Sequence, residues 1–228
     1  MTKPSWIIDL DNTLYPAHSN LFAQIDVRMG TFIADMFDVD RVEARRIQKD
    51  YFKRYGTTLS GLIALHDVEP GHFLDYVHDI DVTPIAKDPA LGRQLAALPG
   101  NRYIYTNGSY RHAERILEHL HISHLFDGIF DIAAAKFEAK PALSAMQRCV
   151  QAFEITPNAA TMIDDMAKNL EPAAKLGMHT VWIDTGSEWG ASGAGPFIKE
   201  TASDLKAWLD RQFGPDQDLG KDRKEDKA

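Results

Sequence analysis

From Asp88 onward, short apolar runs alternate with amphipathic segments, and this alternation constrains the fold more than any other feature of the sequence. The short runs are typical of buried strands, whereas apolar side chains that recur every three or four residues are typical of helices. Strands that alternate with helices are joined by right-handed crossovers and form a mostly parallel sheet. The expected strands are 102–106, 128–132, 160–164 and 179–184, and the expected helices are 91–98, 113–120, 141–153, a segment ending at 176, and 201–213.

A further apolar run, at 6–9, belongs to the same sheet, although only helix-like segments separate it from Asp88. Phe22, Ile25 and Met29 begin a series of apolar residues at spacings of three and four, as one apolar helix face requires. Helices are expected at 21–37, 42–55, 60–67 and 71–77. The predicted fold is therefore α/β, with a Rossmann-like, mostly parallel sheet core (1–15 and 88–213) and an inserted helical cap (16–87). Residues 214–228 are nearly all polar or charged, and we expect a disordered tail there.

The overall charge narrows the class of partner. A formal net charge of -8 at pH 7 argues against a nucleic-acid polymer or an anionic membrane, because both require a basic face on the protein. The single cysteine excludes an internal disulfide. Residues 1–5 are too short and polar for a signal peptide, and no apolar run approaches the roughly 20 residues of a membrane span. A cytoplasmic protein is the default expectation, and the sequence gives no indication of an oligomeric state.

Two aspartates, one residue apart, follow the first strand. Asp9 and Asp11 come after the apolar residues 6–8, which places them at the carboxyl end of a strand, where open α/β sheets have their ligand crevice. A carboxylate in that place can bind a metal ion or attack phosphorus as a nucleophile. An Asp-Asn turn after a strand has the same short pattern, so the rest of the chain decides between the two interpretations.

Two later strand ends carry polar residues that suit the same chemistry. Thr106, Asn107 and Gly108 supply a hydroxyl, an amide and an accessible backbone just before a helix, whose amino terminus attracts anions; the same residues are also good helix caps. Asp164 and Asp165 repel each other unless a cation or a proton separates them. Mg²⁺ takes oxygen ligands from one or two carboxylates, from waters and from substrate phosphate.

A lysine precedes the helix expected at 141–153. Pro141 is expected to be the first residue of that helix, where proline is favoured. A cation at a helix amino terminus is unfavourable, so we expect Lys140 to face a negative charge. Lys136 is the competing candidate, and a solvated surface lysine is the alternative role. We prefer Lys140 because the proline fixes its place in the turn.

In this combination and order, the motifs resemble those of the haloacid dehalogenase superfamily, and specifically its phosphatases with a helical cap inserted after the first motif. The matching segments are Asp9-Leu10-Asp11-Asn12-Thr13, Thr106-Asn107, Lys140-Pro141, and Asp164-Asp165 with Asn169, and the resemblance covers about residues 5–186. Residues 11–16 and 55–62 further resemble the pyrimidine 5'-nucleotidase branch. The resemblance implies a hydrolase of small phosphorylated metabolites, with a pyrimidine nucleoside monophosphate as the expected substrate.

The resemblance also implies roles for the aspartates. Asp9 would attack phosphorus to form an aspartyl-phosphate, and Asp11 would protonate the leaving oxygen and then activate the hydrolytic water. The implied cofactor is Mg²⁺, held by the side chain of Asp9, the backbone carbonyl of Asp11 and the carboxylate of Asp165, with Asp164 close by.

The remaining motif residues would bind the substrate. Thr106 and the backbone around Asn107 and Gly108 would hold phosphate oxygens, while Lys140 would neutralise charge on the nucleophile and the transferring group. The cap would close over the site and select the leaving group. The cap residues expected to contact a nucleotide are Tyr51, Arg54, Tyr55 and Thr58, which offer aromatic rings and hydrogen-bond donors.

Other activities fit parts of this pattern. A sugar-phosphate phosphatase or a phosphomutase of the same superfamily would retain all four motifs and differ mainly in the cap. A dehalogenase shares the nucleophile but has no use for a carboxylate at Asp11. A phosphoacceptor receiver domain also uses aspartates, a threonine and a lysine, but it has the acidic pair on the first strand, whereas here the pair at 164–165 comes last.

Overall fold

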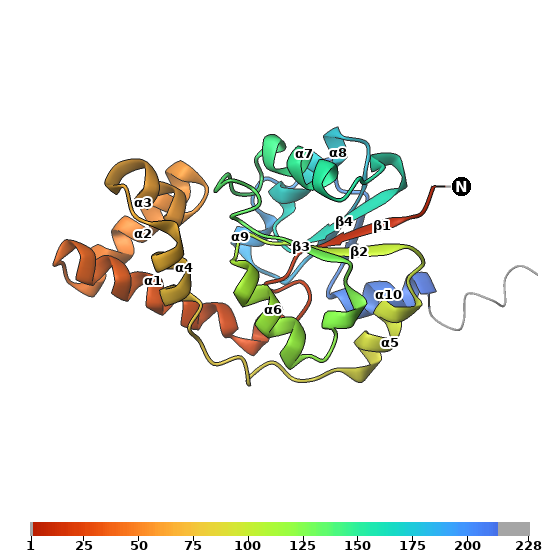
Figure 1. Cartoon of the computed structure of the whole chain (residues 1–228), viewed down its shortest axis with the longest axis horizontal. Coiled ribbons are helices and arrows are strands. Elements are labelled where there is room, and N and C mark those ends of the chain that lie inside the picture. Colours follow the sequence, from red (N-terminus) through yellow and green to blue (C-terminus); the bar gives the residue numbers. More distant parts are fainter. Residues whose placement is uncertain (1, 214–228) are drawn as a thin grey trace, which may run out of the picture.

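The computed structural model describes residues 2–213, and the tail expected at 214–228 lies outside the described residues. A six-stranded sheet with the order β3-β2-β1-β4-β5-β6 forms the centre of the molecule (Figure 1). All five strand pairs are parallel, as the alternation of strands and helices predicts. The strands are β1 (Ser5–Ile8), β2 (Asn101–Tyr105), β3 (Gly128–Phe130), β4 (Ala160–Asp164), β5 (His179–Ile183) and β6 (Glu200–Ala202).

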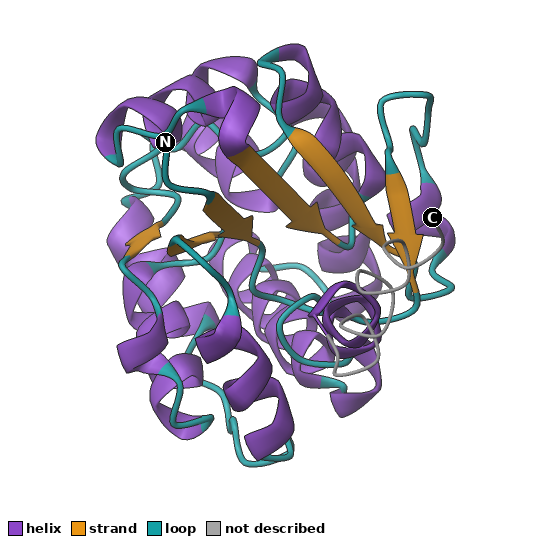
Figure 2. Cartoon of the chain, turned by 90° about the vertical axis from the view of Figure 1, so that its right-hand side faces the viewer, coloured by secondary structure: helices purple, strands orange, loops and turns teal. Residues whose placement is uncertain are grey.

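Helices cover both faces of the sheet (Figure 2). The core helices are α5 (Pro89–Ala97), α6 (Tyr110–His119), α7 (Leu143–Ala152), α8 (Leu170–Lys175), α9 (Glu188–Ala191) and α10 (Leu205–Phe213), and α10 follows β6. Successive side chains of a strand point to opposite faces, so Trp6 and Ile8 pack in one hydrophobic cluster with α5, α6 and α10, whereas Ile7 packs in the other with α7 and α8. Burial on both faces explains why β1 is apolar at every position after Ser5.

Two local expectations for this region are wrong. Residues 200–202 form strand β6 rather than the start of the last helix, because their backbone pairs with β5; a three-residue strand is too short to show an alternating pattern. Helix α7 begins at Leu143, so Pro141 precedes the helix and is not its first residue. The glycine-rich segment 186–195 contains the short helix α9.

Four of the five α-helices between β1 and β2 in the chain form a bundle beside the sheet, at the left of Figure 1. They are α1 (Leu21–Phe37), α2 (Arg41–Tyr55), α3 (Thr58–His66) and α4 (Pro70–Val77), and short 3₁₀ helices occur at 17–19, 123–125, 157–159 and 167–169. Side-chain caps define three of the helix starts: Asp40, Thr57 and Glu69 each accept hydrogen bonds from backbone N–H groups in the first turn. Each expected helix of this segment therefore forms, within two residues of its expected start.

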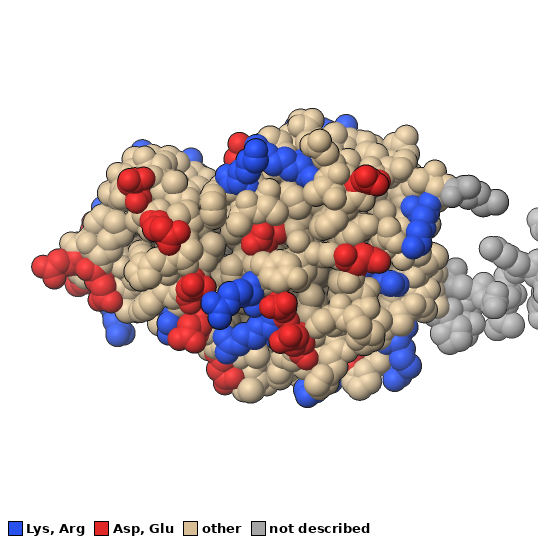
Figure 3. All heavy atoms as spheres, viewed as in Figure 1, with Lys and Arg blue, Asp and Glu red and all other residues tan. Residues whose placement is uncertain are grey.

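On the face that Figure 3 shows, acidic and basic side chains are interspersed. Within residues 2–213, no helix has both the length and the apolar character needed to cross a bilayer.

Candidate active site

A cleft of about 590 Å³ lies between the helical bundle and the carboxyl ends of the sheet strands. The segments after β1, β2, β3 and β4 bring the motif residues to one edge of the sheet, because parallel strands end on the same side. The motif residues that line the cleft are Asp9, Asp11, Asn12, Thr106, Asn107, Gly108, Lys140, Asp165 and Asn169. Segments that are far apart in the sequence thus share one cavity, whose size is typical of small-molecule sites.

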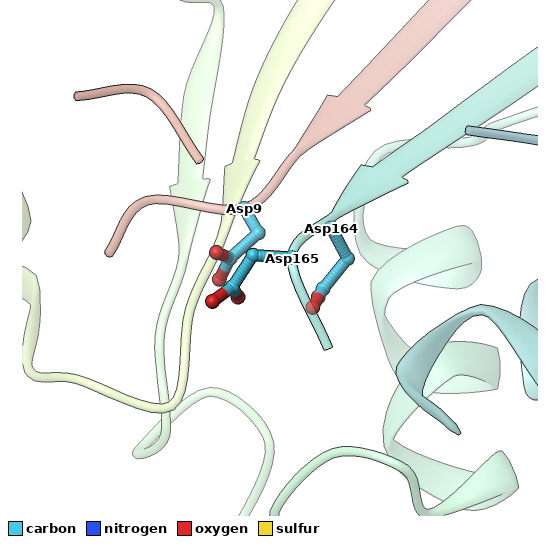
Figure 4. Close-up of side chains that lie close together, drawn as sticks. All are labelled: Asp9, Asp164 and Asp165. Atoms are coloured by element: carbon cyan, nitrogen blue, oxygen red, sulfur yellow. The ribbon is translucent and has the colours of Figure 1, made fainter. Parts of the chain in front are cut away.

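Three buried carboxylates form the aspartate cluster: Asp9, Asp164 and Asp165 (Figure 4). One carboxylate oxygen from each lies within 4.8 Å of the others. Lys140 is the cation among them: its Nζ donates to Asp9 Oδ1 at 2.6 Å, to Asp164 Oδ2 at 2.8 Å and to the backbone oxygen of Tyr105 at 3.0 Å. All three ammonium protons are therefore used, and Lys140, only 4% exposed, is fixed in position.

The charge balance of the aspartate cluster favours a bound cation. Burial, together with the neighbouring carboxylates, raises the pKa of Asp9 and of Asp165 well above the usual range, and the attraction of Lys140 only partly opposes this. Burial alone would lower the pKa of Lys140, but the charges of Asp164 and Asp9 raise it. One ammonium cannot balance three buried carboxylates, whereas a divalent metal with oxygen ligands would. The donor set therefore fits Mg²⁺.

The two adjacent aspartates differ in how much of each carboxylate is free. Asp164 Oδ1 accepts from the backbone N–H of Met166 at 2.8 Å and from Asn169 Nδ2 at 2.9 Å, and Oδ2 accepts from Lys140. The carboxylate of Asp165 has no hydrogen-bond partner within residues 2–213, and its backbone oxygen accepts from Trp182 Nε1 at 2.9 Å. Of the two, Asp165 therefore has the carboxylate that is free to contact a cation, whereas the carboxylate of Asp164 is held against Lys140.

Asp11 lies apart from the aspartate cluster. Its Oδ1 accepts a 2.6 Å hydrogen bond from the hydroxyl of Tyr15 and lies 2.9 Å from Nε2 of His112. Burial alone would raise the pKa of Asp11, but His112 and the Tyr15 hydrogen bond outweigh burial and lower it to about 2. Oδ1 of Asp11 is thus occupied by these partners, whereas Oδ2 has no hydrogen-bond partner among the described residues.

His112 is a site residue that the sequence interpretation missed. It lies in the first turn of α6, is 2% exposed, and contacts a residue 101 positions earlier in the chain. Its ring stacks on that of His78 with a centroid distance of 4.3 Å. Burial and His112 together lower the pKa of His78 to about 3, although Asp11 opposes the shift. No sequence motif indicates a role for His112. In the sequence it is only a polar residue beside the apolar face of α6.

The segment after β2 is held by its own hydrogen bonds. Thr106 Oγ1 accepts from the backbone N–H of Gly108 at 2.9 Å, and Asn107 Oδ1 accepts from the backbone N–H of Lys140 at 2.9 Å. The Gly108 amide is therefore turned toward Thr106 rather than into the cleft. Asn107 instead positions the loop that carries Lys140, which explains why this lysine faces the cluster although Pro141 is not part of the helix.

The bundle side of the cleft differs from the sequence prediction. Of the four predicted cap residues, Thr58 lines the cleft, whereas Tyr51, Arg54 and Tyr55 are not among its lining residues. Tyr51 packs toward α3, where its hydroxyl lies 2.6 Å from His66 Nε2, and Arg54 pairs with Asp50 at 3.0 Å. The residues of α2 that line the cleft are Arg45, Gln48, Lys49 and Phe52, and further lining aromatic residues are Phe22 from α1 and Trp189 from α9.

Comparisons with known proteins match most of the chain. The family model for haloacid dehalogenase-like hydrolases matches residues 6–177. Phosphate metabolism protein 8 of Saccharomyces cerevisiae is 26% identical over 194 residues, which are 77% of this chain and 60% of that protein. Enolase-phosphatase E1 of Xylella fastidiosa (strain M12) is 33% identical over 85 residues, which are 36% of this chain and 35% of that protein. The matched regions thus span less than two thirds of either relative.

Solved structures share the fold. The HAD phosphatase from Thermococcus onnurineus has a TM-score of 0.63 at 16% identity, with 93% of this chain and 98% of that chain covered. The L-2-haloacid dehalogenase PA0810 has a TM-score of 0.60 at 14% identity, with 92% of this chain and 100% of that chain covered. Proteins named for two different chemistries share this architecture, so side chains rather than the fold distinguish them.

Proposed function

Because the chain belongs to the haloacid dehalogenase-like hydrolases, we propose that it is a Mg²⁺-dependent phosphomonoester hydrolase that acts through an aspartyl-phosphate on Asp9. The observation that carries the proposal is the division of labour among the four aspartates. Asp9 is held by Lys140, Asp164 orients the same lysine, Asp165 is free to bind a metal, and Asp11 has separate partners. A nucleophile and an acid–base residue in different surroundings are what two-step phosphoryl transfer requires.

In the first step, one oxygen of Asp9 forms a bond to phosphorus while the bond to the leaving oxygen breaks. Asp9 Oδ1 is held by Lys140, which leaves Oδ2 to attack. The leaving oxygen keeps the bonding electrons and takes a proton from Asp11. Because the pKa of Asp11 in the free site is about 2, that proton has to arrive with the substrate, as on the monoanion of the phosphate ester. Lys140 stays at 2.6 Å from the nucleophile and favours the orientation in which Asp9 faces the cleft.

In the second step, water attacks phosphorus, gives a proton to the carboxylate of Asp11, and the bond to Asp9 breaks to regenerate its carboxylate. Mg²⁺, held by the carboxylates of Asp9 and Asp165 and the carbonyl of Asp11, would offset repulsion between the nucleophile and an anionic substrate. The hydroxyl of Thr106, which is 1% exposed, can donate to a phosphate oxygen. A dehalogenase has no use for Asp11 as an acid–base residue, so the presence of Asp11 favours phosphoryl transfer over dehalogenation.

We further propose that the preferred substrates are pyrimidine nucleoside monophosphates. Residues 11–16 and 55–62 support this branch of the superfamily by their resemblance to it. The cleft adds aromatic faces from Phe22, Phe52 and Trp189, and polar groups from α2, such as Gln48. Stacking is typically worth about 1 to 3 kcal/mol per base and tolerates every base, so the polar groups and the size of the cleft must provide the preference for pyrimidines.

A phosphate-release screen over nucleoside monophosphates and sugar phosphates tests both levels of this proposal. We expect Mg²⁺-dependent release, with the highest kcat/KM for UMP and CMP. If purine nucleotides or sugar phosphates equal or exceed these values, the pyrimidine preference is wrong and the phosphatase assignment stands. Isomerised sugar phosphate without released phosphate would identify a phosphomutase, and absence of turnover on all substrates would overturn the phosphatase assignment.

Substitutions in the adjacent aspartates should separate metal binding from lysine positioning. Asp165→Ala removes a direct metal ligand, so it should raise the Mg²⁺ concentration for half-maximal activity by about 100-fold or more. For comparison, mutation of a residue that only contacts a metal ligand typically lowers metal affinity or activity by about 10- to 100-fold. Asp164→Ala should instead lower the melting temperature more, since it removes three hydrogen bonds. A Mg²⁺ titration and a thermal melt of each variant measure the two effects. The reverse ranking in the titration would exchange the two roles.

A further inference from the structure

Asp11, Tyr15 and His112 form a hydrogen-bonded network, here called the Asp11 network, which uses only one oxygen of the carboxylate. Both contacts are to Oδ1: the Tyr15 hydroxyl at 2.6 Å and His112 Nε2 at 2.9 Å. Oδ2 of Asp11 has no hydrogen-bond partner within the described chain, and Asp11 lines the cleft. One oxygen is thus anchored, and the other is free for a ligand.

The ring of His112 is held in place from several sides. Its backbone N–H donates to Ser109 Oγ, which caps α6, and the same hydroxyl lies 2.9 Å from His78 Nδ1. His78 stacks on the ring at an interplanar angle of 14°. A Cβ at position 108 would lie 3.1 Å from His112 Cδ2, so Gly108 makes room for the ring. The ring has little freedom to move away from Asp11.

The direction of the hydrogen bond between His112 and Asp11 follows from what each group can offer. Nδ1 of His112 is buried and has no partner among the described residues. The Asp11 carboxylate can only accept, so Nε2 of His112 carries the proton of the hydrogen bond between them. Tyr15, which is 2% exposed, can only donate its hydroxyl proton to the same carboxylate oxygen. Two donors from different elements therefore fix the orientation of one carboxylate.

We propose that His112 and Tyr15 are positioning residues, which hold Asp11 so that its Oδ2 reaches the leaving oxygen of the substrate. The inference rests on the proposed phosphatase function and extends it, because neither residue belongs to the four motifs. The geometry gives the reason: without the anchor on Oδ1, the carboxylate would rotate about its side-chain torsions, and proton transfer requires a heavy-atom approach of about 2.6 to 3.2 Å. A buried histidine that only fills space in the core would have no such effect.

The test compares two esters that differ in their need for a general acid. An alkyl phosphate needs a proton on its leaving oxygen, whereas p-nitrophenyl phosphate releases a stable anion. The value of kcat/KM reports the steps through departure of the leaving group, so it excludes the later role of Asp11 as a base. The expected signature of lost positioning is a large fall in kcat/KM for the alkyl ester and a small fall for the aryl ester.

The variants are chosen by the reach of their donors. In His112→Asn the amide reaches only as far as ring Nδ1, so kcat/KM for the alkyl ester should fall by about 100-fold, within the usual contribution of general acid catalysis. In His112→Gln the amide nitrogen reaches the position of ring Nε2, so most of this loss should be recovered. Asp11→Asn, which has no acid at all, should show the same ester preference more strongly.

Tyr15→Phe provides a second variant that does not depend on how the histidine substitutions fold. It removes only the hydroxyl and leaves a ring of the same shape in the core. One donor remains on Asp11, so the fall in kcat/KM for the alkyl ester should be about tenfold, the size of one hydrogen bond to a charged group. The matched control is His119→Asn on the same helix, whose ring contacts the backbone oxygen of Ile85 at 2.8 Å, outside the cleft.

The outcomes separate the two levels of the proposal. If the wild-type protein releases phosphate from both esters, and the His112→Asn and Tyr15→Phe variants lose both esters equally or neither of them, the positioning role is wrong and the phosphatase function stands. If His119→Asn gives the same ester preference, the effect belongs to α6 as a whole and the positioning role is again wrong. If the wild-type protein hydrolyses neither ester, nor any substrate of the phosphate-release screen, the proposed function fails, and the positioning role fails with it.

Discussion

The Asp9→Asn variant is expected to release no measurable phosphate while keeping its fold. Asparagine has the shape of aspartate but is not a nucleophile and is a poor metal ligand, so both steps of the proposed reaction are lost. Loss of a covalent nucleophile costs on the order of 10⁶-fold in a well-studied enzyme of another class, and we expect an effect of that order here. Circular dichroism and phosphate release measure the two parts of this prediction.

The stability of the same variant follows from the charge of the aspartate cluster. Burial and the neighbouring carboxylates raise the pKa of Asp9, so its ionised form costs free energy in the folded state at neutral pH. Asparagine removes that cost, and Lys140 retains Asp164 as an anionic partner. The melting temperature should therefore be equal to or higher than that of the wild type.

Asp131 provides the matched control for Asp9. It also follows a strand, β3, and is 8% exposed, but it accepts from the backbone N–H groups of Tyr110 and Ala134 and does not line the cleft. Asp131→Asn keeps one of the two acceptor oxygens, loses the other hydrogen bond and should retain activity. Normal Mg²⁺-dependent turnover by a folded Asp9→Asn protein would remove the basis of the whole functional proposal.

Replacing Lys140 by methionine should reduce both activity and stability. The substitution leaves the buried carboxylates of Asp9 and Asp164 without their cation, and breaking one partner of a buried ion pair typically costs about 3 to 5 kcal/mol. For a chain of this length, that corresponds to a fall in melting temperature of roughly 6 to 20 °C. Activity should fall by about 100- to 1000-fold, which is the usual loss when one group that stabilises charge in the transition state is removed.

Mg²⁺ should raise the melting temperature of the Lys140→Met variant more than that of the wild type, because the metal would then be the only cation in the aspartate cluster. Lys136→Met is the matched control: it is the same substitution four residues earlier, at an exposed position. It should change neither property appreciably. A Lys140→Met protein as stable as the Lys136→Met protein, with and without Mg²⁺, would show that the buried ion pairs do not contribute as described.

The sequence could predict the sheet side of the site because periodicity locates strand ends, and parallel strands end together. That argument brings Asp9, Thr106 and Asp164 to one edge without any knowledge of long-range contacts. The prediction that Lys140 rather than Lys136 faces a negative charge had a weaker basis. It relied on Pro141 as the first residue of the helix, whereas in the structure a hydrogen bond from the backbone N–H of Lys140 to Asn107 holds the lysine in place.

The bundle side could not be predicted in the same way. Helix α2 carries aromatic residues on two faces, with Tyr51 and Tyr55 four residues apart, and Phe52 four residues after Gln48. Composition does not tell which face packs against α3 and which faces the cleft, since that depends on the partner helices. His112 was missed for a related reason, because its contact with Asp11 joins two elements that only the completed fold brings together.

The position of β1 at the centre of the sheet has a consequence for the order of folding. Its residues pair only with β2 and β4, and Ser5 lies opposite Ala160, 155 residues later in the chain. At a synthesis rate of about 5 to 20 residues per second, roughly 8 to 30 s separate the two strands on the ribosome. During that interval the helices α1–α4 can form through local contacts, whereas β1 lacks both neighbours and its apolar side chains stay exposed to aggregation. A nascent chain that ends before β4 would carry Asp9 without Asp164 and Asp165, so the aspartate cluster is assembled late in the folding of the protein.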